Sequence, residues 1–381
     1  MLSQRGDRTC FFKLHIDQRI SRKCMSLSNN TLLSRRRALA TLMSGTVVLA
    51  TGRAFATDDM ADMAMHGAPF PDLGPLPPRP QTLRKVTLAW NENAICTAAV
   101  PVAIKQEIFT RYGLSVDFVN FSGSTDQLLE AIATGKADGA VGMALRWLKP
   151  LDQGFDVKLV AGLHGGCMRL LSNSTGGVKS LPDLKGKAIG TSDLASPDKA
   201  FFSILLKQAG LNPDSDVTWR AFPGDLLPIA LQRGEVAAIC GGDPLAWEFR
   251  KQHDLHQIAT NMDGAYAHRT CCVIGVRGQL LRKEPYIANA LVRSILEGGR
   301  VVGEHPAVAA AVFSRYAPKV PVEDLTAMLK EHAHHDQQIG TVFQEQIAAY
   351  AQDLKTIGVF SDGLNAQKFA QRVTSDPFRA A

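Results

Sequence analysis

The chain has 381 residues, of which 45% are hydrophobic and 20% are charged. This composition is typical of a globular protein with a core large enough for one big domain or two smaller ones, and it excludes a collagen-like or wholly disordered chain. The formal net charge of +6 belongs to the start of the chain, because residues 1–56 hold ten lysines and arginines against two acidic residues, which leaves −2 for residues 57–381. This distribution argues against a nucleic-acid partner.

The first 56 residues have the organisation of an export signal. The basic segment Arg35–Arg37 precedes an uncharged stretch at residues 38–52, and the small-residue pattern Ala54–Ala56 follows. This pattern predicts a cleavable signal, too short to cross a bilayer core of about 30 Å as a helix. The paired arginines resemble a twin-arginine signal, with an ordinary Sec signal as the alternative, and Met25 allows a later start. We therefore expect a cleaved periplasmic protein that begins near Thr57.

Export changes what the cysteines can do. Two of the seven cysteines lie in the signal, and an odd number in an oxidising compartment leaves at least one thiol unpaired or bound to something. Five cysteines are also too few for a disulfide scaffold, so the hydrophobic core has to stabilise the fold. The five that remain are Cys96, Cys167, Cys240, Cys271 and Cys272.

After a proline-rich linker at residues 57–82, short apolar runs alternate with amphipathic segments. This β-α-β-α-β order predicts a mainly parallel sheet with helices on both faces. The predicted strands are residues 85–90, 114–121, 137–143 and 157–163, and the predicted helices are 98–112 and a segment that ends at 134.

The middle of the chain repeats this plan. The segments 129–139 and 229–238 are alike, because in each a helix ends at a glycine and a short buried strand follows at once. Two such modules indicate two similar lobes, and the helices that follow Cys272 are expected to pack around them. The predicted strands are 187–190, 217–222 and 236–240, and the predicted helices are 197–209, 226–232, 283–304, 306–316, 322–334, 341–357 and 366–373.

Several short sequence segments, in their order along the chain, resemble those of the solute-binding proteins of ABC importers. The resemblance is to the branch that handles nitrate, alkanesulfonates, taurine and thiamine-precursor pyrimidines. The segments are residues 181–190, the two helix-glycine-strand modules, Asp243-Pro244, and residues 282–285 at the start of a long helix. The resemblance covers residues 84–375. It departs at Ala237, where such proteins often carry an aspartate, as the first module does at Asp138.

The resemblance implies an α/β fold of the two-lobed periplasmic-binding-protein kind (type II), with a small anionic or heteroaromatic solute in a cleft that closes like a hinge. Lobe 1 would comprise residues 83–172 and 272–381, and lobe 2 residues 173–271. The expected partners are the permease and the ATPase of an importer, and we expect a monomer without enzymatic activity or a cofactor.

Two other functions are weighed against this one. Pyrimidine synthases of thiamine biosynthesis share the fold and use a cysteine-rich segment, of which Cys271-Cys272 is reminiscent. A copper or soft-metal protein is suggested by Met60, Met63, Met65 and His66, whose spacing could hold copper but also occurs in disordered segments.

Ligands of open α/β sheets bind beyond the carboxyl ends of the strands, at helix N-termini. Four loops have this position, at residues 90–93, 123–125, 192–196 and 241–243, although Ser124, Thr125 and Ser196 can equally be helix N-caps. Candidates for neutralising an anion are Arg146, Arg169 and Arg269, and candidates for stacking on a ring are Trp90, Trp147 and Trp247.

Two further loops, residues 163–168 and 268–272, should border the cleft where the chain crosses between lobes. Cys167 and Cys271 could bind a soft metal with His164, but no C-x-x-C or H-x-x-x-H spacing supports this, so we expect no metal and a structural role, as a disulfide between the two or as small core residues. Cys272 should then point to the opposite face, because neighbouring strand residues alternate.

The late histidines His332, His334 and His335 are expected on a solvated helical face. The predicted ligand-binding residues are Asn91, Glu92, Ser124, Thr125, His164, Cys167, Ser192, Asp193, Asp243, Thr270 and Cys271.

Overall fold

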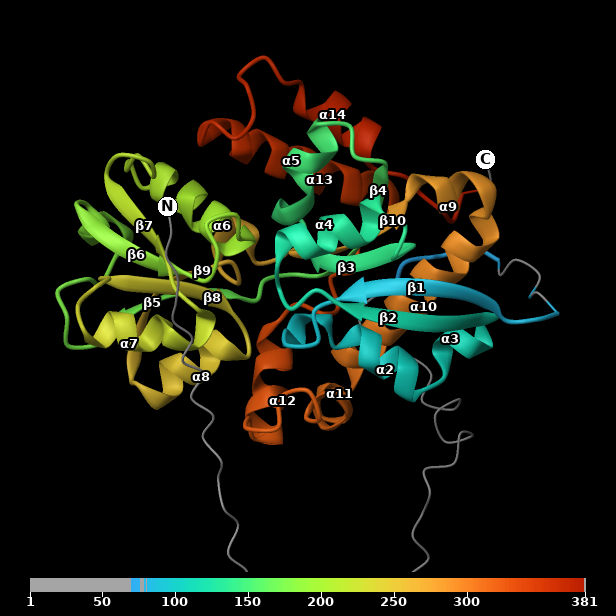
Figure 1. Ribbon diagram of the computed structural model, residues 1–381, viewed down its shortest axis with the longest axis horizontal. Coiled ribbons are helices and arrows are strands. Elements are labelled where there is room, and N and C mark those ends of the chain that lie inside the picture. Colours follow the sequence, from blue (N-terminus) through green and yellow to red (C-terminus); the bar gives the residue numbers. More distant parts are fainter. Residues whose placement is uncertain (1–69, 76–78, 80, 380–381) are drawn as a thin grey trace, which may run out of the picture. The chain divides into compact units, whose positions relative to one another are not determined.

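The computed structural model describes residues 70–75, 79 and 81–379 (Figure 1). The expected export signal, the Met/His motif and most of the proline-rich linker lie outside the described residues. Among the described residues, no helix combines the length and the apolar character needed to cross a membrane.

Ten strands form two five-stranded sheets. The first sheet contains β1 (Arg84–Trp90), β2 (Leu114–Asn120), β3 (Gly139–Met143), β4 (Val157–His164) and β10 (Cys272–Arg277), in the order β2-β1-β3-β10-β4. The second contains β5 (Met168–Asn173), β6 (Lys187–Thr191), β7 (Val217–Ala221), β8 (Ala238–Gly242) and β9 (Leu255–Thr260), in the order β7-β6-β8-β5-β9.

One strand in each sheet runs against the others. Strand β10 pairs antiparallel with β3 and β4, and β5 pairs antiparallel with β8 and β9. These are the strands by which the chain enters each sheet from the other one, after β4 and after β9. The chain leaves one sheet at the carboxyl ends of its strands and enters the other sheet at the carboxyl ends of that sheet's strands. The entering strand therefore runs antiparallel to its neighbours, and the remaining four strands of each sheet share one direction. The two-lobed α/β architecture is thereby confirmed.

Helices cover both sheets. Helix α10 packs on α2, α3 and β4, whereas α13 packs on β4, α6 and α14. The helical elements are η1 (Ile95–Thr97), α2 (Ala99–Lys105), α3 (Ile108–Arg111), α4 (Thr125–Ala133), α5 (Leu145–Asp152), α6 (Pro197–Gln208), α7 (Leu227–Gln232), α8 (Leu245–Gln252), α9 (Gly278–Lys283), α10 (Pro285–Glu304), α11 (Pro306–Phe313), α12 (Val322–Glu331), α13 (Gly340–Thr356) and α14 (Ala366–Val373).

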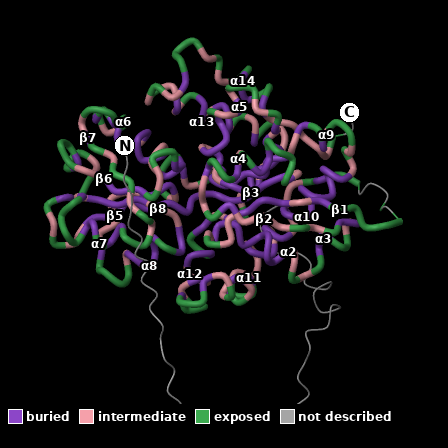
Figure 2. Tube along the Cα trace, in the orientation of Figure 1, coloured by how far each residue is buried: buried purple, intermediate pink, exposed green. Residues whose placement is uncertain are grey.

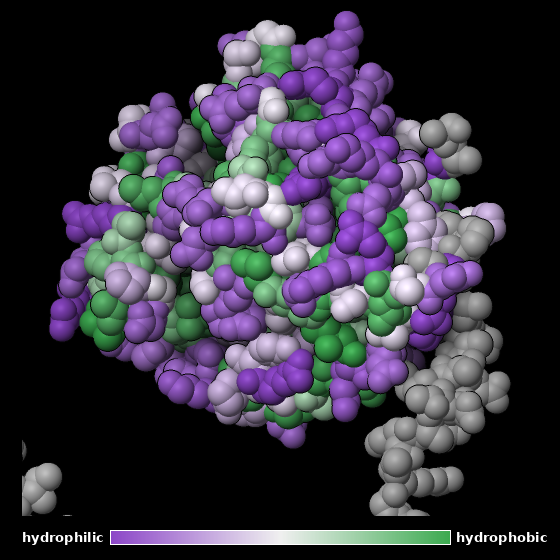
Figure 3. Space-filling view, turned by 45° about the vertical axis from the view of Figure 1, so that its right-hand side comes forward, coloured by the Kyte–Doolittle hydropathy of each residue, from purple (hydrophilic) through white to green (hydrophobic). Residues whose placement is uncertain are grey.

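The core is shared by both sheets. The strands are mostly buried (Figure 2), and one apolar cluster contains Leu88 of β1 together with Ile189 of β6. The visible surface, by contrast, carries polar side chains with apolar ones scattered among them (Figure 3).

The prediction of elements needs several corrections. Strands β5 and β9 and helices α5 and α8 were not predicted, and β10 occupies residues where no strand was expected. The expected helix 98–112 is divided into η1, α2 and α3. The expected helix 322–334 ends at Glu331, because His332 adopts extended backbone angles (φ −74°, ψ 131°).

Candidate ligand-binding site

The carboxyl ends of the parallel strands of both sheets meet at the two crossings of the chain. Thr125, the first residue of α4, lies with its Oγ1 3.5 Å from the carbonyl of Ala195, which precedes α6. The loops 123–125 and 192–196 are thus brought together, and with them the N-termini of two helices. Both loops carry the caps of those helices: Ser124 accepts a hydrogen bond from the N–H of Gln127, and Ser196 accepts one from that of Lys199.

Arg146 of α5 lies buried beside this junction. Its Nη1 donates to the carbonyl of Gly123 and to Thr125 Oγ1, both at 2.6 Å, and its Nε has no hydrogen-bond partner among the described residues. Burial lowers the pKa of Arg146, and the nearby carboxylates of Asp198 and Asp193 only partly offset this. None of the ion pairs between described residues includes Arg146, so its positive charge is available to an anion.

The other two candidate arginines are neutralised within the protein. Arg169 forms a bidentate salt bridge with Asp243, with nitrogen–oxygen distances of 2.9 and 2.8 Å. It forms a second salt bridge with Glu331 at 2.8 Å. Arg269 pairs with Asp353 at 2.5 Å. These pairs leave Arg146 as the candidate for recognising an anion.

Asp243 was expected to contact a ligand, but the structure commits its carboxylate to internal partners. It is 2% exposed and accepts hydrogen bonds from Arg169 and from His332 Nε2, the latter at 3.0 Å. Burial raises the pKa of Asp243, but the hydrogen bonds from His332 and Arg169 more than offset this, so its pKa lies below the usual range. This network joins β5, the end of β8 and the segment after α12.

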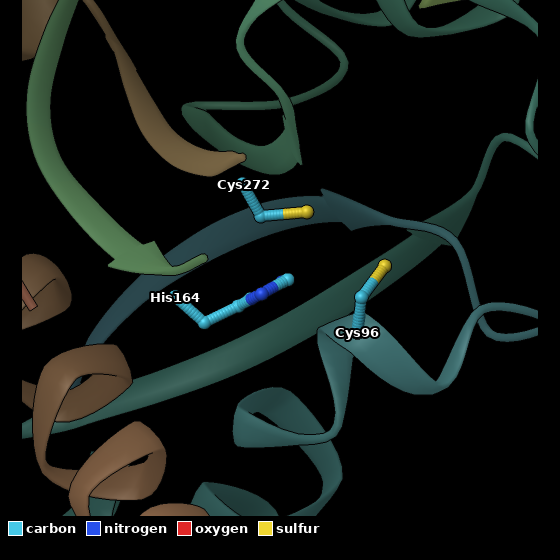
Figure 4. A group of neighbouring side chains, drawn as sticks. All are labelled: Cys96, His164 and Cys272. Carbon is cyan, nitrogen blue, oxygen red and sulfur yellow. The ribbon is translucent and has the colours of Figure 1, made fainter. Parts of the chain in front are cut away.

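A group of thiols and imidazoles fills the place where the crossings meet. Cys272 opens β10 and lies directly opposite His164, the last residue of β4, in the antiparallel register, so both side chains occupy the same face. Cys96 of η1 reaches the same point from the loop after β1 (Figure 4). The two sulfurs and an imidazole nitrogen all lie within 4.8 Å of one another, and all three residues are buried.

Cys167 and Cys271 lie next to this group, and the disulfide, one of the two roles expected for them, is not formed. Their Sγ atoms are 3.8 Å apart, whereas bonded sulfurs are about 2.05 Å apart. Asn261 holds the pair: its Oδ1 accepts the N–H of Cys167 at 2.8 Å, and its Nδ2 lies 3.3 Å from the sulfur of Cys271. All five cysteines of the described residues are free thiols.

Cys272 was expected to point away from Cys271. It instead joins Cys96 and His164, because β10 begins at Cys272 and Cys271 lies outside the regular alternation of the strand. The thiols influence one another: hydrogen bonds from Cys167 and Cys272 lower the pKa of Cys96, and those from the same two residues lower the pKa of Cys271.

Two of the late histidines belong to this buried region rather than to a solvated face. His332 and His334 are 2% and 1% exposed, and the rings of His164 and His334 have centroids 4.7 Å apart. Burial pushes the pKa of His334 well below its usual value. The helix ends before them and the chain turns inward, which the sequence pattern did not indicate; only His335 remains exposed.

Two of the five remaining predicted ligand residues bind within their own loops. Asn91 accepts the N–H of Asn93, and Asp193 accepts that of Ala195 at 2.9 Å. Ser192 is exposed.

The last two predicted residues are Glu92 and Thr270. Glu92 donates its N–H to Asn120 Oδ1 at 3.4 Å. Thr270 is buried beside Gly162, and its Oγ1 has no hydrogen-bond partner among the described residues.

The tryptophans are core residues. Trp90 packs edge-on against Tyr316 with ring centroids 5.1 Å apart, Trp147 is fully buried, and Trp247 lies between the guanidinium groups of Arg169 and Arg250.

Sequence reasoning missed Cys96, Cys272, Asn261 and His334 as members of one site. The pairing of β4 with β10 places Cys272 opposite His164, but β10 was not predicted, so the sequence could not show this register. The run of polar and sulfur-containing residues at both crossings was the available signal.

Comparison with known proteins agrees with this architecture. The sequence profile of the NMT1-like family matches residues 79–316. The nitrate import ATP-binding protein NrtC of Synechocystis is 25% identical over 217 residues, which are 52% of this chain and 32% of NrtC. The chain therefore spans about a third of the length of that relative.

Two solved structures are similar to this one in fold. The nitrate-binding protein NrtA of Synechocystis PCC 6803 has a TM-score of 0.65 at 14% identity, covering 79% of this chain and 88% of NrtA. The alkanesulfonate-binding protein SsuA of Xanthomonas axonopodis pv. citri, bound to MOPS, has a TM-score of 0.64 at 15% identity, covering 77% of this chain and 99% of SsuA.

Proposed function

Because the chain belongs to the NMT1-like family, we propose that it is the solute-binding component of an ABC-type importer and captures a small anion between its two sheets. The names of the relatives support this, since they include a nitrate-binding and an alkanesulfonate-binding protein. Neither an enzyme related to pyrimidine synthases nor a dedicated copper carrier is favoured by these relatives.

The proposal includes the place and the partners of the protein. It would reach the periplasm through its twin-arginine-like signal and deliver its solute to a permease driven by an ATPase. The similarity to a nitrate import ATP-binding protein supports an association with such an ATPase.

The anion is supported by one arrangement, in which a buried cation lies beside two helix N-termini. Helices α4 and α6 begin on either side of the contact between Thr125 and Ala195, and each offers the positive end of its dipole. Arg146 adds a positive charge, and no carboxylate of the described part of the chain lies within ion-pair distance of it. A heteroaromatic solute has less support, because the three candidate tryptophans are occupied by core packing.

Calorimetry with nitrate, ethanesulfonate and an aminopyrimidine tests this proposal. We expect one of the anions to bind and Arg146→Gln to weaken it about 10–100-fold, since a hydrogen bond to a charged group contributes about 1.5–3 kcal/mol. Arg293→Gln is the matched control, because Arg293 is also buried without an ion-pair partner but donates to the carbonyl of Leu73. Equal affinity of Arg146→Gln and the unsubstituted protein, or binding of the aminopyrimidine alone, would exclude the proposed anion site.

A further inference from the structure

One cluster of side chains is not used by the anion site. It consists of Cys96, His164 and Cys272 and is called the thiol–imidazole cluster below. Its three elements all belong to the first sheet or to the loop after β1, so the cluster is assembled on one lobe and does not depend on how the lobes close.

His164 is a buried group without the partners that it needs. Its side chain is 0% exposed, and neither Nδ1 nor Nε2 has a hydrogen-bond partner among the described residues. Buried polar atoms of native proteins are nearly always paired, so an unpaired imidazole in the core needs an explanation, of which a bound ion is one. The sulfurs of Cys96 and Cys272 lie within 4.8 Å of a ring nitrogen of His164 and are weaker hydrogen-bond acceptors than a carboxylate.

The chemistry of the cluster is that of a soft-metal site. Two thiols and an imidazole are the ligands that Cu(I) and Zn(II) prefer, and no carboxylate of the described residues belongs to this group. Zinc–sulfur and zinc–nitrogen bonds of about 2.3 and about 2.0 Å place ligands of one ion about 3.5–4 Å apart. Separations within 4.8 Å therefore need only a small rotation of the side chains.

A second buried imidazole lies beside the cluster. His334 lies against His164, and its own two ring nitrogens have no partner among the described residues. The cluster therefore lies in the apolar core, where both ring nitrogens of His164 and of His334 have no hydrogen-bond partner among the described residues.

We propose that Cys96, His164 and Cys272 bind one thiophilic d10 metal ion, Cu(I) or Zn(II), where the two crossings meet. Binding forms two metal–sulfur bonds and one metal–nitrogen bond, and the two thiol protons are released to solvent. Metal binding and solute binding are measured separately, so failure of one leaves the other standing.

The test uses the full chain with Cys10→Ser and Cys24→Ser, so that only the described cysteines remain. The reduced, metal-free protein is loaded with Zn(II), or with Cu(I) in competition with bicinchoninate, and its metal content is measured after desalting. We expect one ion per chain, at least tenfold weaker binding in Cys96→Ser, Cys272→Ser and His164→Gln, and sulfur and nitrogen ligands in the X-ray absorption spectrum.

Two controls make the result specific. Cys240→Ser should keep full affinity. Cys240 is an equally buried thiol, but it lies on β8 of the second sheet and contacts Asp198 of α6. A chain with Met63→Leu, Met65→Leu and His66→Ala should also keep it, which separates the cluster from the Met/His motif.

The competing outcomes are distinct. Absence of retained Zn(II) and Cu(I), unchanged binding in both Cys96→Ser and Cys272→Ser, or loss of binding only in the Met/His variant would each overturn the proposal. If a cluster variant does not fold, the ligand set in the spectrum of the parent chain decides, and purely oxygen and nitrogen ligands would overturn the proposal.

Discussion

At the scale of residues, two of the three candidate arginines, Arg169 and Arg269, have carboxylate partners, whereas Arg146 has none among the described residues. Arg169 and Asp243 are both buried, and each has further partners in Glu331 and His332. Arg146 is buried without such a partner. The sequence could name all three arginines as candidates, but only the folded structure separates those that hold the protein together from the one that is free to bind.

Substitution of Asp243 by asparagine should destabilise the protein strongly. It leaves Arg169 buried with only the half-exposed Glu331 as a carboxylate partner, and breaking a buried pair typically costs about 3–5 kcal/mol. Urea unfolding measures the loss. Asp156→Asn, which removes an exposed pair with Arg282, should cost less than about 1 kcal/mol.

The cost of Asp243→Asn should also depend on pH. The pKa of Asp243 is lower in the folded than in the unfolded protein, so its contribution is complete above the unfolded value of about 3.9 and disappears as the pH falls through the folded value. The groups that contact its carboxylate are the guanidinium of Arg169 and the imidazole of His332. A difference between the two proteins that stays constant to the lowest pH at which both fold would contradict this role.

At the scale of elements, the sequence pattern predicted those helices and strands whose signal is continuous along the chain. The two helix-glycine-strand modules were found because each is continuous in sequence and ends in a glycine turn. Strand β5 was missed because its buried Arg169 breaks the apolar pattern, and β9 because His256 and Gln257 make it look like a loop. Strand β10 was missed because it begins at the second residue of a cysteine pair, and its partners are the distant strands β3 and β4.

The crossing segments pack so closely that glycine is required. A Cβ on Gly166 would lie 2.4 Å from the carbonyl oxygen of Asn261, which belongs to the opposite crossing. Gly166→Ala must therefore push the two crossings apart, at a cost of about 1–3 kcal/mol. Chemical denaturation measures this cost. Gly177→Ala, where a Cβ meets nothing within 4 Å, should leave the stability nearly unchanged, and equal effects of both substitutions would refute the argument.

At the scale of the whole molecule, the proposed export signal would decide where the site works. If it is of the twin-arginine type, Arg35→Lys together with Arg36→Lys should stop export, and N-terminal sequencing of the periplasmic protein should give a start near Thr57. Unchanged export would indicate the Sec route. An uncleaved protein in the cytoplasm would contradict a periplasmic receptor, although it would leave the fold untouched.

The order of strands also constrains how the chain can be made. All strands of the second sheet lie between residues 168 and 260, but β4 has β10 as its sheet neighbour, and β10 ends at Arg277. During synthesis the first sheet therefore waits with unpaired strand edges until the second lobe has been translated, so the lobe that comes later along the chain can be the first to fold. A pathway that exports only completed folds would hold the protein back until that last central strand has closed the first sheet.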